Sequence, residues 1–397
     1  MMLDVAYITL AFLAASLGDI ASHWSFDAIE DGEVVDHIQG LNAEVNGAVL
    51  QQGALHGCLY FDGLDDYASV ESIGAVQKIL GNLGEGTISA WFRFDHSPGF
   101  MDIETIFYLG AEEQYSVFGS TTDGFELEVG HFSAQRRLYW TLITTEGDDT
   151  SVPFCWSTTE HLDTSRWYHI VSTVSESEGT HVYLNNVEIL DSNELTWNFG
   201  DESMCRFFGD VLLQEVLWFG KGLWDNEHKF YEGAIDEVKI WSRAITAEEV
   251  HAEYERIASV GQLEINPSIP DEIIVVNGIS LFGVYENIAE LGWRIDDGDF
   301  TLQQIDTIES NWSIDLLSSE VPAGRHEIKV LGRNAARRAF IDSRIIIQPD
   351  LNGDDIVNIA DLLMLIDAWG ECECPEDLTG NGQVGVNDLL FLIGQWS

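Results

Sequence analysis

Oxygen-bearing side chains recur at a fixed spacing in residues 350–397 of this 397-residue chain. The sequence DLNGDDIVNIAD begins at Asp350, and the related sequence DLTGNGQVGVND begins at Asp377. In both copies, positions 1, 3, 5 and 12 carry a side-chain oxygen. Ca²⁺ is a hard cation that takes about six to eight oxygen ligands, and a loop with this spacing can surround one ion. The repeat therefore predicts two calcium sites.

The two loops differ in the ligands that they offer. In the first loop these are the side chains of Asp350, Asn352, Asp354, Asn358 and Asp361 with the backbone carbonyl of Ile356, and in the second the side chains of Asp377, Thr379, Asn381 and Asp388 with the carbonyl of Gln383. Three carboxylates against two predict tighter binding at the first loop. Position 6, where the chain turns sharply, is Gly382 in the second loop but Asp355 in the first, which carries a conformational cost.

Each loop leads into an apolar, helix-like segment that ends near Trp369 or Trp396. This duplicated loop and helix, without the entering helix of a full EF-hand, resembles a type I dockerin module. The resemblance implies a cohesin-like partner. Dockerins often carry Ser or Thr at loop positions 10 and 11, whereas this chain has Ile359-Ala360 and Val386-Asn387. We therefore expect a different partner, or packing of the module against its own chain.

A second group with catalytic potential is the pair Glu126 and Glu128. The alternating sequence Phe125-Glu-Leu-Glu-Val129 predicts a strand with both acids on one face, about 7 Å apart, which is compatible with a glycosidase. The simpler interpretation is the solvent face of an amphipathic strand. No Gly-x-Ser-x-Gly elbow, His-Glu-x-x-His motif or phosphate-binding loop occurs. The sequence thus predicts no catalytic residues and leaves a glycoside hydrolase as an alternative.

Short alternating strands separated by Gly, Asp, Asn and Ser run from Ala21 to about Arg256, as in Thr87–Phe94 and His181–Leu184. This density of period-two patterning predicts antiparallel sheets packed face to face. Only the end of this region has a helical pattern, with Thr246 as its N-cap and Glu249 completing a capping box.

Several ordered motifs of this region resemble the laminin-G-like, concanavalin A-like jelly roll. They are His23-Trp-Ser-Phe-Asp27, Gly57-Cys-Leu-Tyr-Phe-Asp-Gly-Leu-Asp-Asp-Tyr67, Thr87-Ile-Ser-Ala-Trp91, Arg166-Trp-Tyr-His-Ile170, Val182-Tyr-Leu-Asn-Asn186 and the sequence from Gly233 to Val250. The resemblance implies a jelly roll over residues 22–256. It also implies a structural calcium near the first and last strands, with Asp27, Asp66 and Asp236 as candidates. These aspartates could instead be turn caps.

The same resemblance implies glycan recognition through aromatic residues of connecting segments, since aromatic rings stack on sugar faces. The candidates are Trp140, Trp156, Trp197, Trp218 and Trp224, while Trp91 and Trp167 are assigned to packing. The Glu-x-Asp-x-x-Glu and Glu-x-Asp-x-Glu strands of laminarinase-type hydrolases on this fold are missing.

Residues 264–348 hold about seven strand-like runs, enough for a small β-sandwich. The sequences around Trp312 and Val321 resemble bacterial immunoglobulin-like spacer domains. The expected fold class is therefore mainly β, with a jelly roll, an immunoglobulin-like sandwich and a small helical dockerin-like or EF-hand-like module at 350–397.

The composition narrows the function further. A formal net charge of −50 argues against nucleic-acid binding, because phosphates would be repelled. Residues 1–18 resemble a signal peptide without its basic start, which predicts a secreted protein, and no later segment has the length of a membrane span. Cys155 and Cys205 could pair, whereas Cys372 and Cys374 lie too close for an easy disulfide, and the odd count leaves one thiol unpaired or buried.

Three functions follow from these observations. The first is a secreted, non-catalytic, calcium-binding modular protein whose jelly roll recognises a glycan or a surface protein. The second is a polysaccharide-degrading hydrolase that uses the jelly roll, and the third is a structural or adhesion protein.

Overall fold

The structure is a computed structural model that describes residues 19–96, 103–112, 124–130, 137–143, 154–157, 162–189, 207–211, 213–224, 227–275, 278–303 and 311–396, with backbone only for 137–143, 154–157, 224 and 303. Contacts divide the chain into two compact units, residues 1–259 and residues 260–397. Each unit is described separately.

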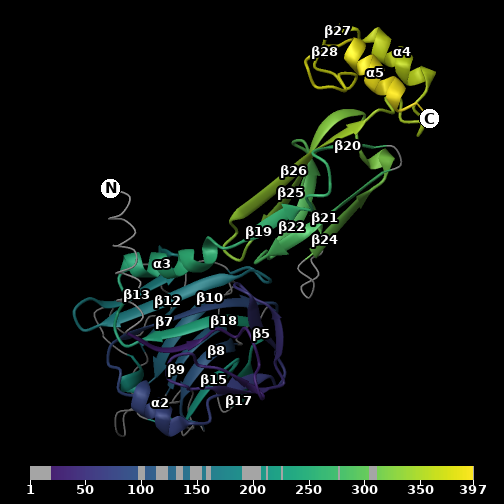
Figure 1. Ribbon diagram of the computed structural model, residues 1–397. Helices are drawn as coiled ribbons and strands as arrows, with labels where there is room; N and C mark the ends of the chain where they lie inside the picture. Colours follow the sequence, from purple (N-terminus) through teal and green to yellow (C-terminus); the bar gives the residue numbers. More distant parts are fainter. Residues whose placement is uncertain are drawn as a thin grey trace. The chain divides into compact units, whose positions relative to one another are not determined.

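The first unit is a sandwich of two antiparallel eight-stranded sheets (Figure 1). One sheet has the order β14-β13-β12-β7-β18-β5-β4, with β1 also pairing with β18. Its strands are β1 Ile20–Trp24, β4 Val49–Gln52, β5 Gly57–Asp62, β7 Gly86–Phe94, β12 Tyr168–Ser175, β13 Gly179–Leu184, β14 Val187–Glu188 and β18 Glu232–Trp241.

The other sheet has the order β11-β10-β9-β8-β15-β6-β3-β2. Its strands are β2 Glu33–Val34, β3 Ala43–Asn46, β6 Tyr67–Ser69, β8 Ile103–Gly110, β9 Gly124–Gly130, β10 Arg137–Ile143, β11 Phe154–Ser157 and β15 Val216–Phe219. A two-stranded hairpin, β16 Lys221–Trp224 and β17 Glu227–Phe230, follows β15. The predicted mainly β, jelly-roll-like class is confirmed.

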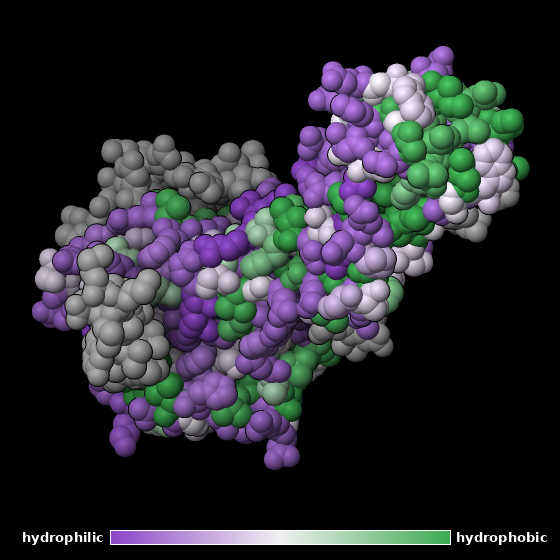
Figure 2. Space-filling model, turned by 45° about the horizontal axis from the view of Figure 1, so that its top comes forward, coloured by the Kyte–Doolittle hydropathy of each residue, from purple (hydrophilic) through white to green (hydrophobic). Residues whose placement is uncertain are grey.

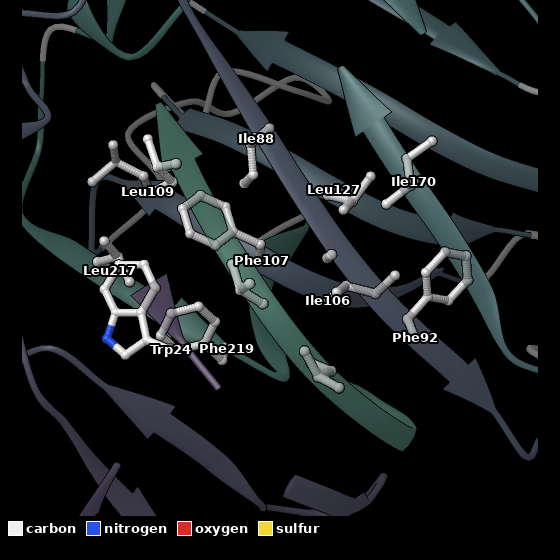
Figure 3. Close-up of a cluster of buried hydrophobic side chains, with 14 of the residues drawn as sticks. Trp24, Ile88, Phe92, Ile106, Phe107, Leu109, Leu127, Ile170, Leu217 and Phe219 are labelled. Carbon is white, nitrogen blue, oxygen red and sulfur yellow. The ribbon is translucent and has the colours of Figure 1, made fainter. Parts of the chain in front are cut away.

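Apolar residues on the facing sides of both sheets form one core (Figure 3). Ile88 and Phe92 of β7 enter it from one sheet, and Phe107, Leu127 and Phe219 enter it from the other. In β18, Ile235, Val238 and Ile240 are all buried. The pairing with β7 shifts between Asp236 and Lys239, so a bulge lets the strand keep its apolar side chains inside while Asp236 faces away.

The predicted helix is confirmed as α3 (Ala247–Ala258), and Thr246 and Glu249 make both hydrogen bonds of the capping box. A second helix, α2 (Ile73–Ile79), and the 3₁₀ turn η1 (Phe208–Asp210) were not predicted. Helix α2 is short, and the Ser72 side chain makes no capping hydrogen bond. The sequence therefore carries too weak a helical signal there.

The second unit begins with another sandwich. Its sheets have the orders β19-β21-β24 and β20-β26-β25-β22-β23. The strands are β19 Gln262–Ile265, β20 Glu272–Ile274, β21 Ile279–Glu286, β22 Glu290–Ile295, β23 Thr301–Gln303, β24 Asn311–Leu316, β25 Gly324–Arg333 and β26 Ala339–Gln348, with the 3₁₀ turn η2 at Ser318–Glu320. Trp312 is buried in the core between them and Trp293 packs against it.

A small helical module ends the described chain. It contains α4 (Ile359–Asp367), α5 (Val386–Gly394) and the short paired strands β27 (Gly370–Glu371) and β28 (Gln383–Val384). Its core residues Leu351, Leu365 and Leu392 belong to one cluster with Ile347 of strand β26. The module therefore shares its core with the sandwich that precedes it. No helix in the described part of the chain is both long and apolar enough to cross a membrane.

The structure corrects one prediction about the cysteines. Cys372 and Cys374 are joined in a disulfide, with their Cα atoms 5.3 Å apart. The chain bends after β27, which shortens this distance below that of an extended strand and into the range of disulfides. Cys58 is free and buried, as expected of an unpaired thiol, and the pair Cys155 and Cys205 lies outside the described side chains.

Candidate functional sites

The first candidate calcium loop closes around two aspartates. Asp350 Oδ1 accepts hydrogen bonds from the amides of Gly353 (2.8 Å) and Asp354 (3.2 Å), and its Oδ2 accepts one from Asp355 (2.6 Å). Asp361 Oδ1 accepts from Leu351 (2.8 Å) and its Oδ2 from the Asn358 amide (2.8 Å). The side chains at loop positions 1 and 12, Asp350 and Asp361, thus hold the loop backbone in a closed turn through these hydrogen bonds.

The second loop repeats these contacts. Asp377 Oδ1 accepts from the amides of Gly380 (2.9 Å) and Asn381 (3.1 Å), and its Oδ2 accepts from Gly382 (2.7 Å). Asp388 Oδ1 accepts from the amide and the hydroxyl of Thr379 (2.9 and 2.8 Å), and its Oδ2 accepts from Gly385 (2.9 Å). Two sequences that differ at four of the six ligand positions therefore fold into the same loop.

The donor set of both loops fits calcium. The aspartates at positions 1 and 12 are buried, whereas the residues at positions 3, 5 and 7 are exposed or half-buried. A carboxylate offers about four lone-pair positions, so the amide bonds leave capacity for an ion. The remaining ligands predicted from the sequence are Asn352, Asp354, Ile356 and Asn358 in the first loop, and Thr379, Asn381 and Gln383 in the second, and all lie along the same turns.

Position 6 shows how the chain accommodates the unusual Asp355. This residue has a φ of 66°, and its counterpart Gly382 has a φ of 83°, so both loops make the same left-handed turn. The Asp355 carboxylate accepts a hydrogen bond of 2.7 Å from the hydroxyl of Ser318 in turn η2. This contact offsets part of the strain of a non-glycine residue in that conformation.

An exposed apolar surface that sequence reasoning did not single out lies on α4 and α5 and on a tryptophan two residues beyond the end of each helix. It is contributed by Ile359, Leu363, Ile366 and Trp369 from the first repeat and by Val386, Leu390, Ile393 and Trp396 from the second, and each is 47–63% exposed. We call these eight residues the paired apolar face. Figure 2 shows apolar residues gathered on this module. The sequence feature that could have predicted this face is that each helix carries apolar residues on both sides, whereas one apolar side is enough to pack against a core.

In the first unit, the structure brings Asp27 and Asp236 to the same turn. Asp236 is fully buried, and its Oδ2 accepts a hydrogen bond of 3.0 Å from Leu55, while its Oδ1 has no hydrogen-bond partner. Burial and the nearby Glu237 and Asp27 raise the pKa of Asp236 well above its usual value. Asp27 Oδ1 accepts from Gly57 at 3.0 Å. An unpartnered buried oxygen beside a second carboxylate fits a bound cation.

Asp66 lies elsewhere, at the other end of β5. Its Oδ2 accepts a hydrogen bond of 3.0 Å from the Asp62 amide, and its pKa is raised mainly by burial. Carboxylate oxygens of Asp62, Asp65 and Asp66 lie within 4.8 Å of one another. This cluster caps the turn at Gly63, whose φ is 77°, so Asp66 has the role of a turn residue.

Glu126 and Glu128 are buried, which corrects the prediction of a solvent face. They lie on β9, on the side opposite the core residues Phe125 and Leu127. The hairpin β16–β17 packs over this side of the sheet, where Leu223 contacts Tyr108 of β8. The two carboxyl groups are close enough to hydrogen-bond, so they are nearer than the predicted 7 Å, because long side chains two residues apart can converge.

Trp218 also departs from the prediction. It lies in β15 rather than in a connecting segment, it is buried, and its ring stacks on Tyr108 at 5.4 Å. Trp91 and Trp167 are buried, as their assignment to packing required. The other candidate ligand contacts, Trp140, Trp156, Trp197 and Trp224, lie outside the described side chains.

Comparison with known proteins supports the fold of the first unit. Residues 62–251, just under half of the chain, match the family model of the concanavalin A-like lectin/glucanases superfamily (Laminin_G_3). This segment is therefore a concanavalin A-like domain, in agreement with the resemblance seen in its sequence. No curated protein matches the chain.

Three solved structures are similar at a low level. The CBM40 module of a Ruminococcus gnavus IT-sialidase, bound to α2,3-sialyllactose, has a TM-score of 0.38 at 14% identity and covers 52% of this chain and 100% of its own. Domain 4 of a Geobacillus stearothermophilus extracellular arabinanase, with arabinotriose, has a TM-score of 0.35 at 18% identity over 59% and 97%. The receptor-binding domain of botulinum neurotoxin type G has a TM-score of 0.41 at 11% identity over 81% and 74%. Likeness at this level carries no information on ligands.

Proposed function

We propose that this chain is a secreted, non-catalytic modular protein that couples a glycan-recognising domain to a partner protein through a calcium-organised docking module. The sandwich of residues 260–348 would act as a spacer between the two functions. The observation that carries the proposal is the paired apolar face, which is repeated on two helices that each begin at a candidate calcium loop.

The paired apolar face has the character of a binding surface. Leu363 and Leu390 occupy equivalent positions in the two repeats and are 61% and 63% exposed. Contiguous exposed apolar patches are uncommon on monomers and often mark interaction sites. Two exposed tryptophans end the two halves of the face, and tryptophan is enriched among the residues that dominate binding energy at interfaces.

Calcium would organise this face. Asn358 and Gly385 are the N-caps of α4 and α5, and the loop aspartates Asp361 and Asp388 lie in the first turns of these helices. An ion held by each loop would therefore fix the start of each helix and the spacing between the two halves of the face. The resemblance to dockerins implies a cohesin-like partner, but Ile359 and Val386 stand where dockerins often carry Ser or Thr. The partner would therefore differ from familiar type I cohesins and would present an apolar contact surface.

Glycan recognition is assigned to the first unit. The proposal is supported by the match of residues 62–251 to a family described by its lectins and glucanases. Hydrolysis is not favoured, because the two carboxyl groups of Glu126 and Glu128 are in contact, whereas glycosidase pairs are about 5–9.5 Å apart. Both groups are also 1–2% exposed, which leaves no access for a polysaccharide.

Docking is tested by measuring binding of the full chain to a panel of immobilised cohesin-like domains that includes members with apolar contact surfaces. We expect binding in calcium, loss of binding in chelator and loss in the Leu363→Asp/Leu390→Asp variant. Glu371→Gln, an exposed change on β27 outside the face, is the matched control and should bind like the wild type. Failure of the wild type to bind any domain of the panel would contradict a cohesin-like partner, and full binding by the double variant would contradict docking through the paired apolar face.

Glycan recognition needs its own measurement. A glycan array probed with the full chain should give binding that the Leu363→Asp/Leu390→Asp variant retains, because that variant changes only the C-terminal module. A chain that is folded but binds no glycan would refute this half of the proposal and favour a structural or adhesion role.

A further inference from the structure

Three polar side chains meet on the covered side of the second sheet of the first unit. Glu126 and Glu128 lie two residues apart on β9 and therefore project to the same side. Thr105 of β8 is the direct cross-strand partner of Glu128. Side chains of directly opposed residues lie on one side of a sheet, with Cβ atoms about 4.5–5.5 Å apart. The hydroxyl of Thr105 therefore neighbours the acid pair.

All three groups are buried and incompletely bonded. Thr105, Glu126 and Glu128 are 0%, 1% and 2% exposed. Thr105 Oγ1, Glu126 Oε2 and Glu128 Oε2 each lack a hydrogen-bond partner. Buried polar atoms are nearly always paired, so three unpaired oxygens on adjacent sheet positions call for a missing partner.

Groups within the described chain do not provide that partner. The carboxyl groups of Glu126 and Glu128 act on each other, and their burial is the largest cause of the raised pKa of both. The ammonium of Lys221, on the covering hairpin, lies 4.2 Å from the ring centroids of Tyr67 and Trp218. One shared proton would join the two carboxyl groups but would leave their outer oxygens and the hydroxyl unpaired.

Gly222 of β16 shows how closely the hairpin covers this position. A Cβ atom at residue 222 would lie 2.1 Å from Thr105 Oγ1, so only glycine permits the approach. The backbone of the hairpin therefore lies directly against the side chain of Thr105, beside the acid pair. A sugar would not enter, whereas a single ion could be held there.

We infer that Glu126, Glu128 and Thr105 form a buried site for a hard divalent cation, Ca²⁺ or Mg²⁺. Two carboxylates neutralise the charge of such an ion, and a hydroxyl oxygen is a suitable third ligand. Backbone carbonyls or water would complete the shell. The site lies on β8 and β9 and is separate from both the C-terminal loops and the turn of Asp27 and Asp236.

The site is tested by counting ions bound to the full chain. Metal-free protein is dialysed to equilibrium against CaCl₂, and in a second series against MgCl₂, and bound metal is measured per chain. The Glu126→Gln/Glu128→Gln variant is expected to bind one ion fewer than the wild type in at least one series. The matched control is Glu104→Gln, a buried acid of β8 that already contacts His96 and the Glu232 amide, and it should keep the wild-type count.

A second variant guards against misfolding of the double substitution. Thr105→Val keeps both carboxylates and the side-chain volume, and at the lowest metal concentration that saturates the wild type it should lose the same ion. A folded Glu126→Gln/Glu128→Gln protein that binds as many Ca²⁺ and Mg²⁺ ions as the wild type overturns the inference. The pair would then be two carboxyl groups that share a proton.

Discussion

Buried ionisable side chains of the first unit divide into two groups with opposite effects of pH. Burial raises the pKa of Glu128 to about 7 and raises the pKa of Asp236 well above its usual value, whereas burial lowers the pKa of His169 to about 3. The folded state therefore holds protons on these acids that the unfolded chain would release, and excludes a proton from the histidine that the unfolded chain would bind.

His169 predicts acid sensitivity. Its ring is stacked 4.9 Å from Trp91 beneath α3, and neither ring nitrogen has a hydrogen-bond partner. Because the folded pKa lies below the ordinary value of 6.5, the contribution of neutral His169 is complete above pH 6.5 and is lost as the pH falls toward 3.

We predict that His169→Phe, which keeps a stacked ring, reduces the fall in Tm between pH 6.5 and 4 relative to the wild type. His181→Phe, at a partly exposed histidine of β13, is the control and should fall like the wild type. Parallel Tm profiles for His169→Phe and wild type would show that the buried ring is not the acid-sensitive group.

Asp236 predicts the opposite dependence when no ion is bound. Its folded pKa is raised, so the stability that it contributes is present at low pH and is lost as the pH rises through the folded value. In chelator at pH 8, Asp236→Asn should therefore have a higher Tm than the wild type, and calcium should reverse this order.

The control is Asp65→Asn, in the exposed acidic turn, which should show neither effect. Equal Tm values for Asp236→Asn and wild type under both conditions would exclude a cation at Asp236.

At the scale of elements, helix α3 is fixed by its N-terminal turn. Glu249 Oε2 accepts a hydrogen bond from the Thr246 amide at 2.9 Å, and Arg243 forms an ion pair with Glu249 at 2.7 Å. Tyr254 of α3 in turn stacks on Trp91 of β7 at 5.7 Å. The cap thus holds the helix that covers His169.

The effect of losing this helix cap on the free energy of unfolding can be predicted. Thr246→Ala should lower the free energy of unfolding by about 1 kcal/mol, because one helix amide loses its acceptor. Thr246→Ser keeps the hydroxyl and should stay close to the wild type. Chemical denaturation that follows the unfolding of the first unit measures the free energy of unfolding of both variants. An alanine variant as stable as the serine variant would mean that the capping hydrogen bond contributes little.

Elements with a clear period were predictable from the sequence, and those set by distant chain segments were not. The alternation of Thr87–Phe94 and the capping box at Thr246 act over neighbouring residues, so both were recovered. The burial of Glu126 depends on the β16–β17 hairpin, which is far away in the sequence. The sequence grouped Asp66 with Asp27 and Asp236 as candidate ligands of one calcium. In the structure, Asp66 lies at the opposite end of β5 from the other two, and this separation along the strand could not be read from the motif.

The net charge of −50 belongs to the whole molecule, and with this charge the proposed calcium ions would contribute to stability as well as to docking. Acidic residues repel one another in a compact chain, and bound cations or salt reduce this repulsion. A calcium ion present at about 100 times its Kd adds about 2.7 kcal/mol to stability. The C-terminal module has a small core, so two such ions would supply a large share of its stability.

We propose that the two C-terminal loops bind calcium, and isothermal titration of the full chain with CaCl₂ measures the number of ions that they hold. Asp350→Ala/Asp361→Ala and Asp377→Ala/Asp388→Ala should each remove one bound ion, with the tighter one lost in the first variant. Glu371→Gln, outside both loops, should remove none. An unchanged stoichiometry in the two loop variants at millimolar calcium would show that neither loop binds the ion.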